Sequence, residues 1–258
     1  MQALEDLVKG FQSISLEEMN SVKLMNRIDT KFLATSEQLP AILAKLEDSY
    51  FVQELQGSRV ARYLTQYFDT PDLQMFVAHQ DGKLTRQKLR TRIYCLTNDA
   101  FCEIKNKNNK KRTKKKRIPI QPEQCLHIFD FEEIREFISA KLQYDISTLI
   151  PQVHNEFERI TLVNFGKTER LTIDANIQFT NPCTHQDAQI PELVIIELKQ
   201  DGNHPSFFKK VLADMRIRPY RISKYCLGTM LTNPNVRINR FKKKLRYIGK
   251  LTHRKLIS

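Results

Sequence analysis

The stretch Gln87-Lys-Leu-Arg-Thr-Arg-Ile-Tyr94 alternates cationic with mostly apolar side chains, and residues 101–107, Phe-Cys-Glu-Ile-Lys-Asn-Lys, repeat the pattern. Successive side chains of an extended chain point to opposite faces. Lys88, Arg90 and Arg92 therefore share one face of the first stretch. The polar face of an ordinary solvated strand mixes both signs of charge. The nearly pure positive charge predicts instead that these strands line a pocket for a polyanion.

The chain as a whole is strongly basic. It has 258 residues with 41% hydrophobic content, which is enough for one large domain or two small ones. Lysine and arginine exceed aspartate and glutamate by 42 − 29 = 13, which favours phosphate compounds, anionic lipid or nucleic acid as partners. No GxGxxG or GxxxxGK[ST] motif occurs, which argues against a Rossmann or P-loop nucleotide site.

Nothing in the sequence predicts export or a membrane span. There is no 18-residue apolar run, and residues 1–6 are neither basic nor continuously apolar. The chain has five cysteines, and no two of them form a CxxC pair. An odd number of cysteines is typical of reduced thiols. We therefore expect a cytoplasmic protein.

Alternating and helical patterns predict about eight strands and a few helices, in hairpin order. This order predicts an α+β fold built on an antiparallel eight-stranded β-barrel, closed or nearly closed, with peripheral helices. Helices are expected at about 3–12, 36–46, 123–142, 207–215 and 221–231, and strands at about 26–35, 50–55, 60–69, 87–94, 101–107, 113–120, 153–164, 170–180 and 193–199.

A single domain is expected over residues 1–235, with its core at about 25–230, followed by a basic tail at 236–258. Basic tails are usually solvated. This one is also a candidate docking segment for the inner face of a membrane or for a membrane-embedded partner protein.

The inward positions of the predicted strands, assigned by their period of two, carry many cations and few carboxylates. Such charges are too costly for a dry core, so the interior is expected to be wet and to hold an anion. Arginine binds phosphate oxygens through paired hydrogen bonds, lysine adds point charge, and one or two carboxylates can hold a bridging divalent cation. The inward candidates are Arg27, Asp29, Lys31, Lys88, Arg90, Arg92, Glu103, Lys105, Lys107, Lys115, Arg117, Phe157, Arg159, Arg170, Thr172, Asp174, Glu197 and Lys199.

Nine short segments resemble the triphosphate tunnel metalloenzyme (CYTH-like) superfamily and, more closely, the VTC domain of vacuolar transporter chaperone polyphosphate polymerases. Each segment alone is a weak signal, whereas their shared order over about residues 25–230 is fairly specific. The segments are Arg27-Ile-Asp-Thr-Lys-Phe32, Tyr67-Phe-Asp-Thr70, Lys88-Leu-Arg-Thr-Arg92, Glu103-Ile-Lys105, Lys116-Arg-Ile-Pro119, Phe157-Glu-Arg159, Arg170-Leu-Thr-Ile-Asp174, Glu197-Leu-Lys199 and Arg221-Ile-Ser-Lys-Tyr225.

The resemblance implies a tunnel that binds ATP and inorganic polyphosphate and transfers the ATP γ-phosphoryl group to the growing chain. It also implies Mn²⁺ or Mg²⁺, with Glu197 as a ligand and Glu103 as a second candidate. Arg221, Ser223 and Lys224 would close one mouth of the tunnel. The expected catalytic residues are Lys31, Arg90, Arg92, Lys105, Arg159 and Arg170, and the expected substrate-binding residues are Arg27, Lys88, Lys107, Lys115, Arg117, Lys199, Arg221, Ser223 and Lys224.

Two positions depart from the family pattern. Phe157 stands where the family usually has tyrosine, so one hydroxyl contact is missing. Arg221 stands where lysine is common, which keeps the charge.

Several alternatives stay open from the sequence. Glu103 and Glu197 could be salt-bridge partners, and Asp174 could be a turn residue. The same site could hydrolyse triphosphate, polyphosphate or nucleoside triphosphates. A non-enzymatic nucleic-acid binder is a third possibility, but the exposed aromatic strand face that stacks bases is missing, so no specific nucleic acid is expected. Crowding of like charges also predicts that Arg90→Ala and Arg92→Ala remove activity and leave the fold intact.

Overall fold

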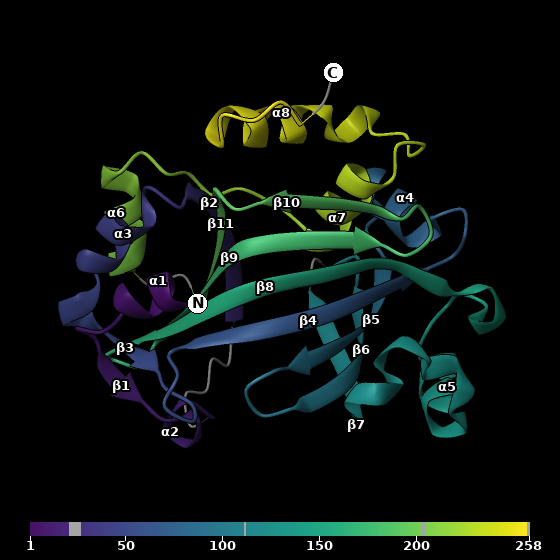
Figure 1. The fold of residues 1–258 in the computed structure, drawn as a ribbon, viewed down its shortest axis with the longest axis horizontal. Coiled ribbons are helices and arrows are strands. Elements are labelled where there is room, and N and C mark those ends of the chain that lie inside the picture. The colour runs from purple at the N-terminus through teal and green to yellow at the C-terminus, as the bar shows by residue number, and fades with distance from the viewer. Residues whose placement is uncertain (21–26, 111, 203–204, 257–258) are drawn as a thin grey trace.

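A curved sheet forms the centre of the molecule, and most of the helices lie around its outside (Figure 1). The computed structural model describes residues 1–20, 27–110, 112–202 and 205–256, with the backbone alone for Asn20 and Arg27. The main path of the 11-stranded sheet is antiparallel throughout. In spatial order it runs β2 (Arg27–Thr35), β11 (Leu193–Asp201), β9 (Glu169–Asn181), β8 (Ile150–Asn164), β4 (Val60–Asp69), β5 (Arg86–Tyr94), β6 (Asp99–Lys107) and β7 (Thr113–Ile120).

Three short strands extend this sheet away from the main path. β3 (Tyr50–Gln53) pairs antiparallel with β8, and β1 (Gln12–Ile14) pairs parallel with β3. β10 (Gln186–Ile190) forms a hairpin with the end of β9. They widen the sheet without joining its two edges.

The predicted antiparallel α+β class is confirmed, but the sheet is open rather than a closed barrel. β2 and β7 are the ends of the main path, and no pairing joins them in the described part of the chain. Both edges carry lysines, Lys31 on β2 and Lys114 to Lys116 on β7. Repulsion between these edges opposes closure, and Pro119 removes a backbone donor from β7. The expected closed barrel is thus corrected to a sheet curved around its inner face.

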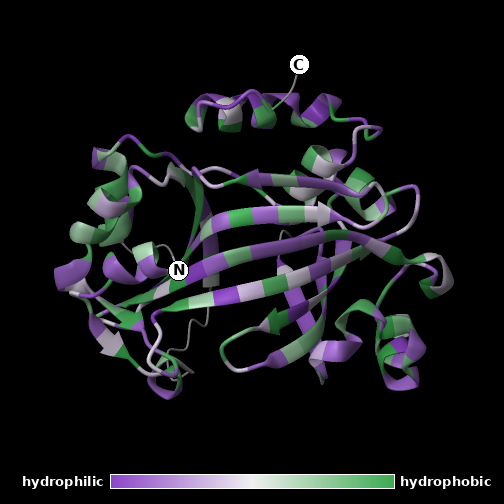
Figure 2. Cartoon of the chain, in the orientation of Figure 1, coloured by the Kyte–Doolittle hydropathy of each residue, from purple (hydrophilic) through white to green (hydrophobic). Residues whose placement is uncertain are grey.

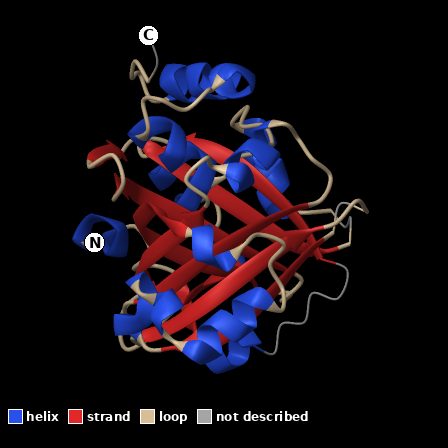
Figure 3. Cartoon of the chain, turned by 90° about the vertical axis from the view of Figure 1, so that its right-hand side faces the viewer, coloured by secondary structure: helices blue, strands red, loops and turns tan. Residues whose placement is uncertain are grey.

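Helices cover the outer face and both ends of the sheet (Figure 3). The predicted helix at 123–142 is wrong in part, because Pro122–Leu126 and Ile128–Asp130 are separate 3₁₀ turns before a shorter helix. The expected tail contains a further helix. The α-helices are α1 (Gln2–Asp6), α2 (Leu16–Asn20), α3 (Leu39–Ala44), α4 (Gln74–Gln80), α5 (Glu132–Ser139), α6 (Phe207–Asp214), α7 (Lys224–Thr232) and α8 (Lys242–Leu251), with other 3₁₀ turns at Glu47–Ser49, Ile146–Thr148 and Asn239–Phe241.

Hydrophobic and hydrophilic residues alternate along the strands, as the sequence predicts (Figure 2). On β5 and β6 the outward residues Leu89 and Ile104 are fully buried beneath the segment that leads to α5. Around Phe32 on β2 a second apolar cluster joins the outer face to α1, α3 and α6. The outer face therefore supplies much of the hydrophobic core. The middle of the inner face is left to carry charge, while Val153 and Phe179 at one end of that face pack against α7.

Helix α7 is fixed against the sheet by a buried polar network. The Asp69 carboxylate accepts hydrogen bonds from the backbone N–H groups of Met75 and Phe76 at the start of α4, both at 2.9 Å. It also accepts one from the Tyr225 hydroxyl of α7. Burial raises the pKa of the Asp69 carboxyl, which these donors oppose. Asp69 therefore joins β4, α4 and α7.

Gly228 lets α7 lie close to β8 and β9. A Cβ atom there would come within 2.5 Å of the Phe179 ring and 2.6 Å of Val153. We expect Gly228→Ala to lower the free energy of unfolding by about 1–3 kcal/mol through overpacking. Gly166→Ala is the matched control, because its Cβ would meet nothing nearer than 3.6 Å. Urea denaturation of both variants measures the difference, and equal midpoints would contradict the close packing of α7.

Candidate functional site

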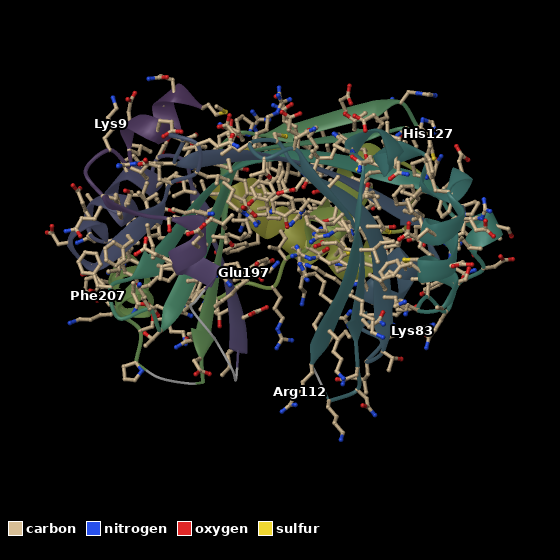
Figure 4. All side chains as sticks on the ribbon, turned by 90° about the horizontal axis from the view of Figure 1, so that it is seen from below. Lys9, Lys83, Arg112, His127, Glu197 and Phe207 are labelled. Atoms are coloured by element: carbon tan, nitrogen blue, oxygen red, sulfur yellow. The ribbon has the colours of Figure 1, made fainter. Side chains whose placement is uncertain are left out.

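The inner face of β5, β6 and β7 carries rows of cationic side chains that lie opposite one another. Register places Arg90 beside Glu103, and Glu103 beside Arg117. The next row holds Lys88, Lys105 and Lys115. Figure 4 looks onto this inner face, with Arg112 at the tip of the β6–β7 hairpin. The period-two assignment of these residues to one face agrees with this register.

The opposite wall is formed by β2, β11 and β9. Glu197 lies between Lys31 of β2 and Thr172 of β9, and Lys199 lies between Asp29 and Arg170. Figure 4 shows Glu197 on the inner side of the curved sheet. The two walls are close enough to influence each other. Lys105 lies on the β5–β7 wall, and its pKa is well below the ordinary value. Arg90, burial, Arg92 and Lys31 of the opposite wall lower it, and Glu197, also of the opposite wall, raises it.

Arg90 and Glu103 form a buried pair at the centre of the first wall. Arg90 donates to Glu103 Oε2 from Nε at 2.7 Å and from a terminal nitrogen, and Lys115 Nζ donates to Oε1 at 2.8 Å. Burial raises the pKa of Glu103, but Arg90, Arg92 and Lys115 outweigh it and hold the pKa well below its usual range. Both oxygens of Glu103 are thus engaged by cations, which is the salt-bridge alternative for this residue.

Arg92 is buried without a carboxylate partner in the described residues. Its Nε donates to Thr65 Oγ1 at 3.2 Å, and its guanidinium carbon lies 5.5 Å from the Tyr63 ring centroid and 5.7 Å from that of Phe157. Burial, Arg90 and Arg159 lower its pKa. The aromatic rings stabilise the cation only in part. Its terminal nitrogens are suited to an anion.

Arg159, Asp174 and Lys224 form a second buried cluster. Arg159 is bidentate to Asp174, at 2.5 and 2.8 Å, and Lys224 Nζ also donates to Asp174. Both cations lie over Phe157, with Lys224 Nζ 3.9 Å from the ring centroid. Burial lowers the pKa of Lys224 to about 7, with Arg159 adding to the effect and Asp174 opposing it. Asp174 thus positions cations here, and both cations contact the Phe157 ring.

Residues 220–224 bridge the two walls at one end of the inner face. The Tyr220 N–H donates to the Lys31 carbonyl at 2.7 Å on one wall, and Lys88 Nζ donates to Ser223 Oγ at 2.7 Å on the other. Ser223 also caps α7, since its Oγ accepts from the Cys226 N–H. Ser223 and Lys224 therefore lie at the site, while Arg221 is exposed beside it.

The remaining predicted residues lie further from the Arg90–Glu103 pair or are less buried. Arg170 and Lys107 are half-buried at the ends of their strands, Lys115 and Arg117 are exposed, and Arg117 lies over the Phe101 ring at 4.1 Å. Arg27 begins β2, and its side chain lies outside the described part of the chain.

Two residues of the site, Tyr63 and Thr65, were not singled out from the sequence, and Tyr67 was named within a family segment but was given no role in the site. Tyr63, Thr65 and Tyr67 of β4 lie under Arg92 or Arg90, and the Tyr67 hydroxyl is 3.4 Å from Arg90. Burial raises the pKa of Tyr67, but Arg90, Arg92 and Lys88 reverse the shift and lower it. The alternation of 60–69 was a signal that could have found them.

Glu197 is suited to hold a metal ion together with substrate phosphates, and less suited to a site made of protein ligands alone. Its oxygens lie 4.0 Å from Lys31 Nζ and 3.7 Å from Lys199 Nζ, longer than hydrogen bonds. Burial raises its pKa, but Lys31, Lys199 and Lys105 hold it well below the usual range, so it is a carboxylate. No group of three His, Cys, Asp or Glu in the described residues could hold a metal ion. Mg²⁺ commonly takes one or two carboxylates with substrate phosphates, which this arrangement matches.

The protein is expected to take up protons when it binds tripolyphosphate. Burial lowers the pKa of Lys199 to about 8 and that of Lys224 to about 7, and a nearby anion raises both values. At pH 8 Lys224 is then mostly neutral when free and charged when bound, so affinity falls as pH rises from 7 to 9. Calorimetry at pH 8 in two buffers of different ionisation enthalpy measures the uptake. Lys224→Arg should reduce it, and equal heats for the wild type would contradict the linkage.

These walls define a class of protein: an antiparallel tunnel-type fold whose inner face is built to hold a strongly anionic, phosphate-rich ligand. A family model described as VTC domain matches residues 26–233, and the chain belongs to the VTC domain family. The earlier resemblance is thereby confirmed. Membership indicates a function in phosphate or polyphosphate chemistry. Comparison with curated proteins found no match.

Two solved structures share the fold. A proposed adenylate cyclase from Bacillus halodurans is 16% identical, with a TM-score of 0.51, over 84% of this chain and 100% of the other. A proposed adenylyl cyclase from Hippeastrum, described as having a dominant triphosphatase activity, is 12% identical, with a TM-score of 0.50, over 78% of this chain and 94% of the other. At such low sequence identity, the structural similarity shows only that these proteins share one fold, the triphosphate tunnel fold.

Within the described residues every helix is too short or too polar to traverse a lipid bilayer.

Proposed function

We propose that the chain is a polyphosphate polymerase that transfers the ATP γ-phosphoryl group to inorganic polyphosphate. The observation that carries the proposal is the surplus of buried positive charge on the inner face. Arg92 and Lys105 form no ion pair with a carboxylate in the described residues, and the three carboxylates Glu103, Asp174 and Glu197 are each surrounded by cations. Such a surplus is stable only in water or with an anion in place.

In the proposed reaction the bond between the γ-phosphorus and the oxygen bridging it to the β-phosphate breaks, and ADP leaves with the bonding electrons. A terminal oxygen of the polyphosphate chain forms the new bond to the γ-phosphorus. Arg90, Arg92 and Arg159 hold the transferred group, while Lys31, Lys105 and Arg170 neutralise the adjoining phosphates. Phosphoryl transfer depends mainly on positioning and charge, so no general base is needed.

Glu197 is the residue proposed to hold Mn²⁺ or Mg²⁺, together with substrate phosphate oxygens. When bound, the ion would neutralise charge on those oxygens. Glu103 would have to release Arg90 and Lys115 to act as a ligand, so we assign it to positioning Arg90.

The product tests the proposal. Purified protein incubated with γ-labelled ATP and Mn²⁺ is expected to give label in a long polymer that resists nucleases and is cut by a polyphosphatase. Label released only as orthophosphate would replace the polymerase with a hydrolase working in the same site. No ATP consumption, with binding of nucleic acid that survives Glu197→Ala, would support the non-enzymatic alternative.

A further inference from the structure

Cationic residues continue outward from the inner face beyond Lys88. Two positions further along the same face of β5 is Arg86, which register places opposite Lys107 of β6. Near them lie Arg221, before α7, and Lys244 of α8. We name Arg86, Lys107, Arg221 and Lys244 the outer cationic surface. Two of its members, Arg86 and Lys244, are outside every group of site residues described so far.

Direct contacts tie α8 to the end of the inner face. Lys244 Nζ donates to the Arg221 carbonyl at 3.0 Å. The Tyr247 ring of α8 stacks on Tyr220 at 4.5 Å, and the Tyr220 backbone is bonded to Lys31 of β2. The helix therefore meets the segment that bridges the two walls.

A second set of contacts fixes the start of α8 on α4. Phe241 packs edge-on against Phe76 at 5.7 Å. Arg240 donates to the Asp81 carbonyl at 3.1 Å, and Gln80 donates to the Arg237 carbonyl at 2.5 Å. Leu245 and Ile248 are fully buried in the same core cluster as Tyr225. Lys244 is thus held in place by a packed helix and is no part of a loose tail.

Three cations of this surface, Arg86, Arg221 and Lys244, lie close together without a neutralising carboxylate in the described residues. In the described residues no ion pair is formed by Arg86, Arg221 or Lys244, and the buried Arg86 Nε has no hydrogen-bond partner. Burial lowers the pKa of Lys244, with Arg221 and Arg86 adding to it, and burial and Arg221 lower that of Arg86. His79, half-buried beside them, has its pKa lowered by burial and then by Lys88 and Arg86. This arrangement favours a bound anion.

We propose that the outer cationic surface binds the inorganic polyphosphate chain beyond the phosphates held by Arg90 and Arg92. The proposal rests on the proposed function. Continuity favours this occupant, because Arg90, Lys88 and Arg86 follow one another on one face of β5, about 7 Å apart, and a linear polyanion can contact all three in turn. A lipid headgroup would meet the outward face of α8 instead, where Lys243, Arg246 and Lys250 are exposed.

The test compares binding of tripolyphosphate and of long-chain polyphosphate at two salt concentrations. For Arg86→Gln and Lys244→Gln we expect unchanged affinity for tripolyphosphate and about fivefold weaker binding of the long chain for each substitution. The salt dependence of long-chain binding should fall by about one unit of log–log slope. Arg86→Lys and Lys244→Arg should retain affinity. Lys250→Gln, on the outward face of α8, is the matched control and should bind like the wild type.

Unchanged long-chain binding in both Gln variants would overturn the proposal. So would equal weakening in Lys250→Gln, which would indicate general attraction, or equal weakening toward tripolyphosphate, which would place the residues in the inner site. Vesicles containing phosphatidylserine form the last arm, and loss of vesicle binding without loss of long-chain binding would assign the surface to lipid. If the wild type makes no polymer from ATP, long-chain binding that still depends on Arg86 and Lys244 would uphold this surface while the polymerase fails.

Discussion

Replacing Arg92 with methionine is expected to reduce activity by about 10²–10³-fold, because one preorganised donor to the transferred phosphoryl group is lost. The fold should not suffer. Arg92 is buried, has no carboxylate partner in the described residues, and is repelled by Arg90 and Arg159. Methionine keeps the apolar contact with Tyr63 and removes the buried charge. The melting temperature should therefore stay unchanged or rise, measured by calorimetry alongside the activity assay.

Arg90→Met is the contrasting variant. It should also lose activity, but it leaves the fully buried Glu103 carboxylate with Lys115 as its remaining ion-pair partner. Loss of one member of a buried pair costs about 3–5 kcal/mol, which is roughly 6–20 °C in melting temperature for a domain of this size. The double variant Arg90→Met, Glu103→Gln should recover stability without activity. A lowered melting temperature in Arg92→Met, or none in Arg90→Met, would contradict this division of roles.

This expectation differs from the sequence-based prediction that either arginine could be removed without harm to the fold. For Arg92 we still expect the crowding of like charges to decide the stability. For Arg90 it is outweighed by the paired hydrogen bonds to Glu103, which depend on the register of β5 and β6.

The second large effect is expected for Glu197→Gln. Metal-dependent activity should fall by about 10²–10³-fold, because the site loses its anionic ligand for the cation and with it several kcal/mol of charge stabilisation. Tripolyphosphate should bind more tightly in the absence of metal, because Lys31 and Lys199 are released from the carboxylate. Steady-state rates over a Mn²⁺ titration, together with calorimetry in chelator, measure both effects.

Asp29→Asn is the matched control for Glu197→Gln. Asp29 lies beside Lys199 on the neighbouring strand but is exposed. Its rate and its dependence on Mn²⁺ should change little. Full metal-dependent activity in Glu197→Gln would contradict the metal assignment, and an equal loss in Asp29→Asn would mean that the carboxylates act only through their overall charge.

Local patterns predicted the inner face well. The period of two is a property of each strand alone, so the alignment of Lys88, Arg90 and Arg92 could be read without knowing their neighbours. The family resemblance then ordered the strands. What the sequence could not supply was which carboxylate meets which cation. Lys224 and Asp174 are 50 residues apart, and Tyr225 and Asp69 are 156 apart.

Two expectations failed for physical reasons. Closure of a barrel depends on strand twist and on the interaction of its edges, and here cationic side chains on both edges oppose it. The C-terminal segment was interpreted as a solvated tail because lysine and arginine dominate it. The signal for a helix was present in Phe241, Leu245 and Ile248, which follow the i, i+4, i+7 spacing of an amphipathic helix and are all buried.

The most direct measurement of the central claim is an experimental structure of the protein with tripolyphosphate and Mn²⁺. We predict phosphate oxygens within hydrogen-bond distance of Arg90, Arg92 and Arg159 on the inner face, with the ion beside Glu197. A triphosphate bound elsewhere, with the guanidinium of Arg92 left in water, would contradict the account.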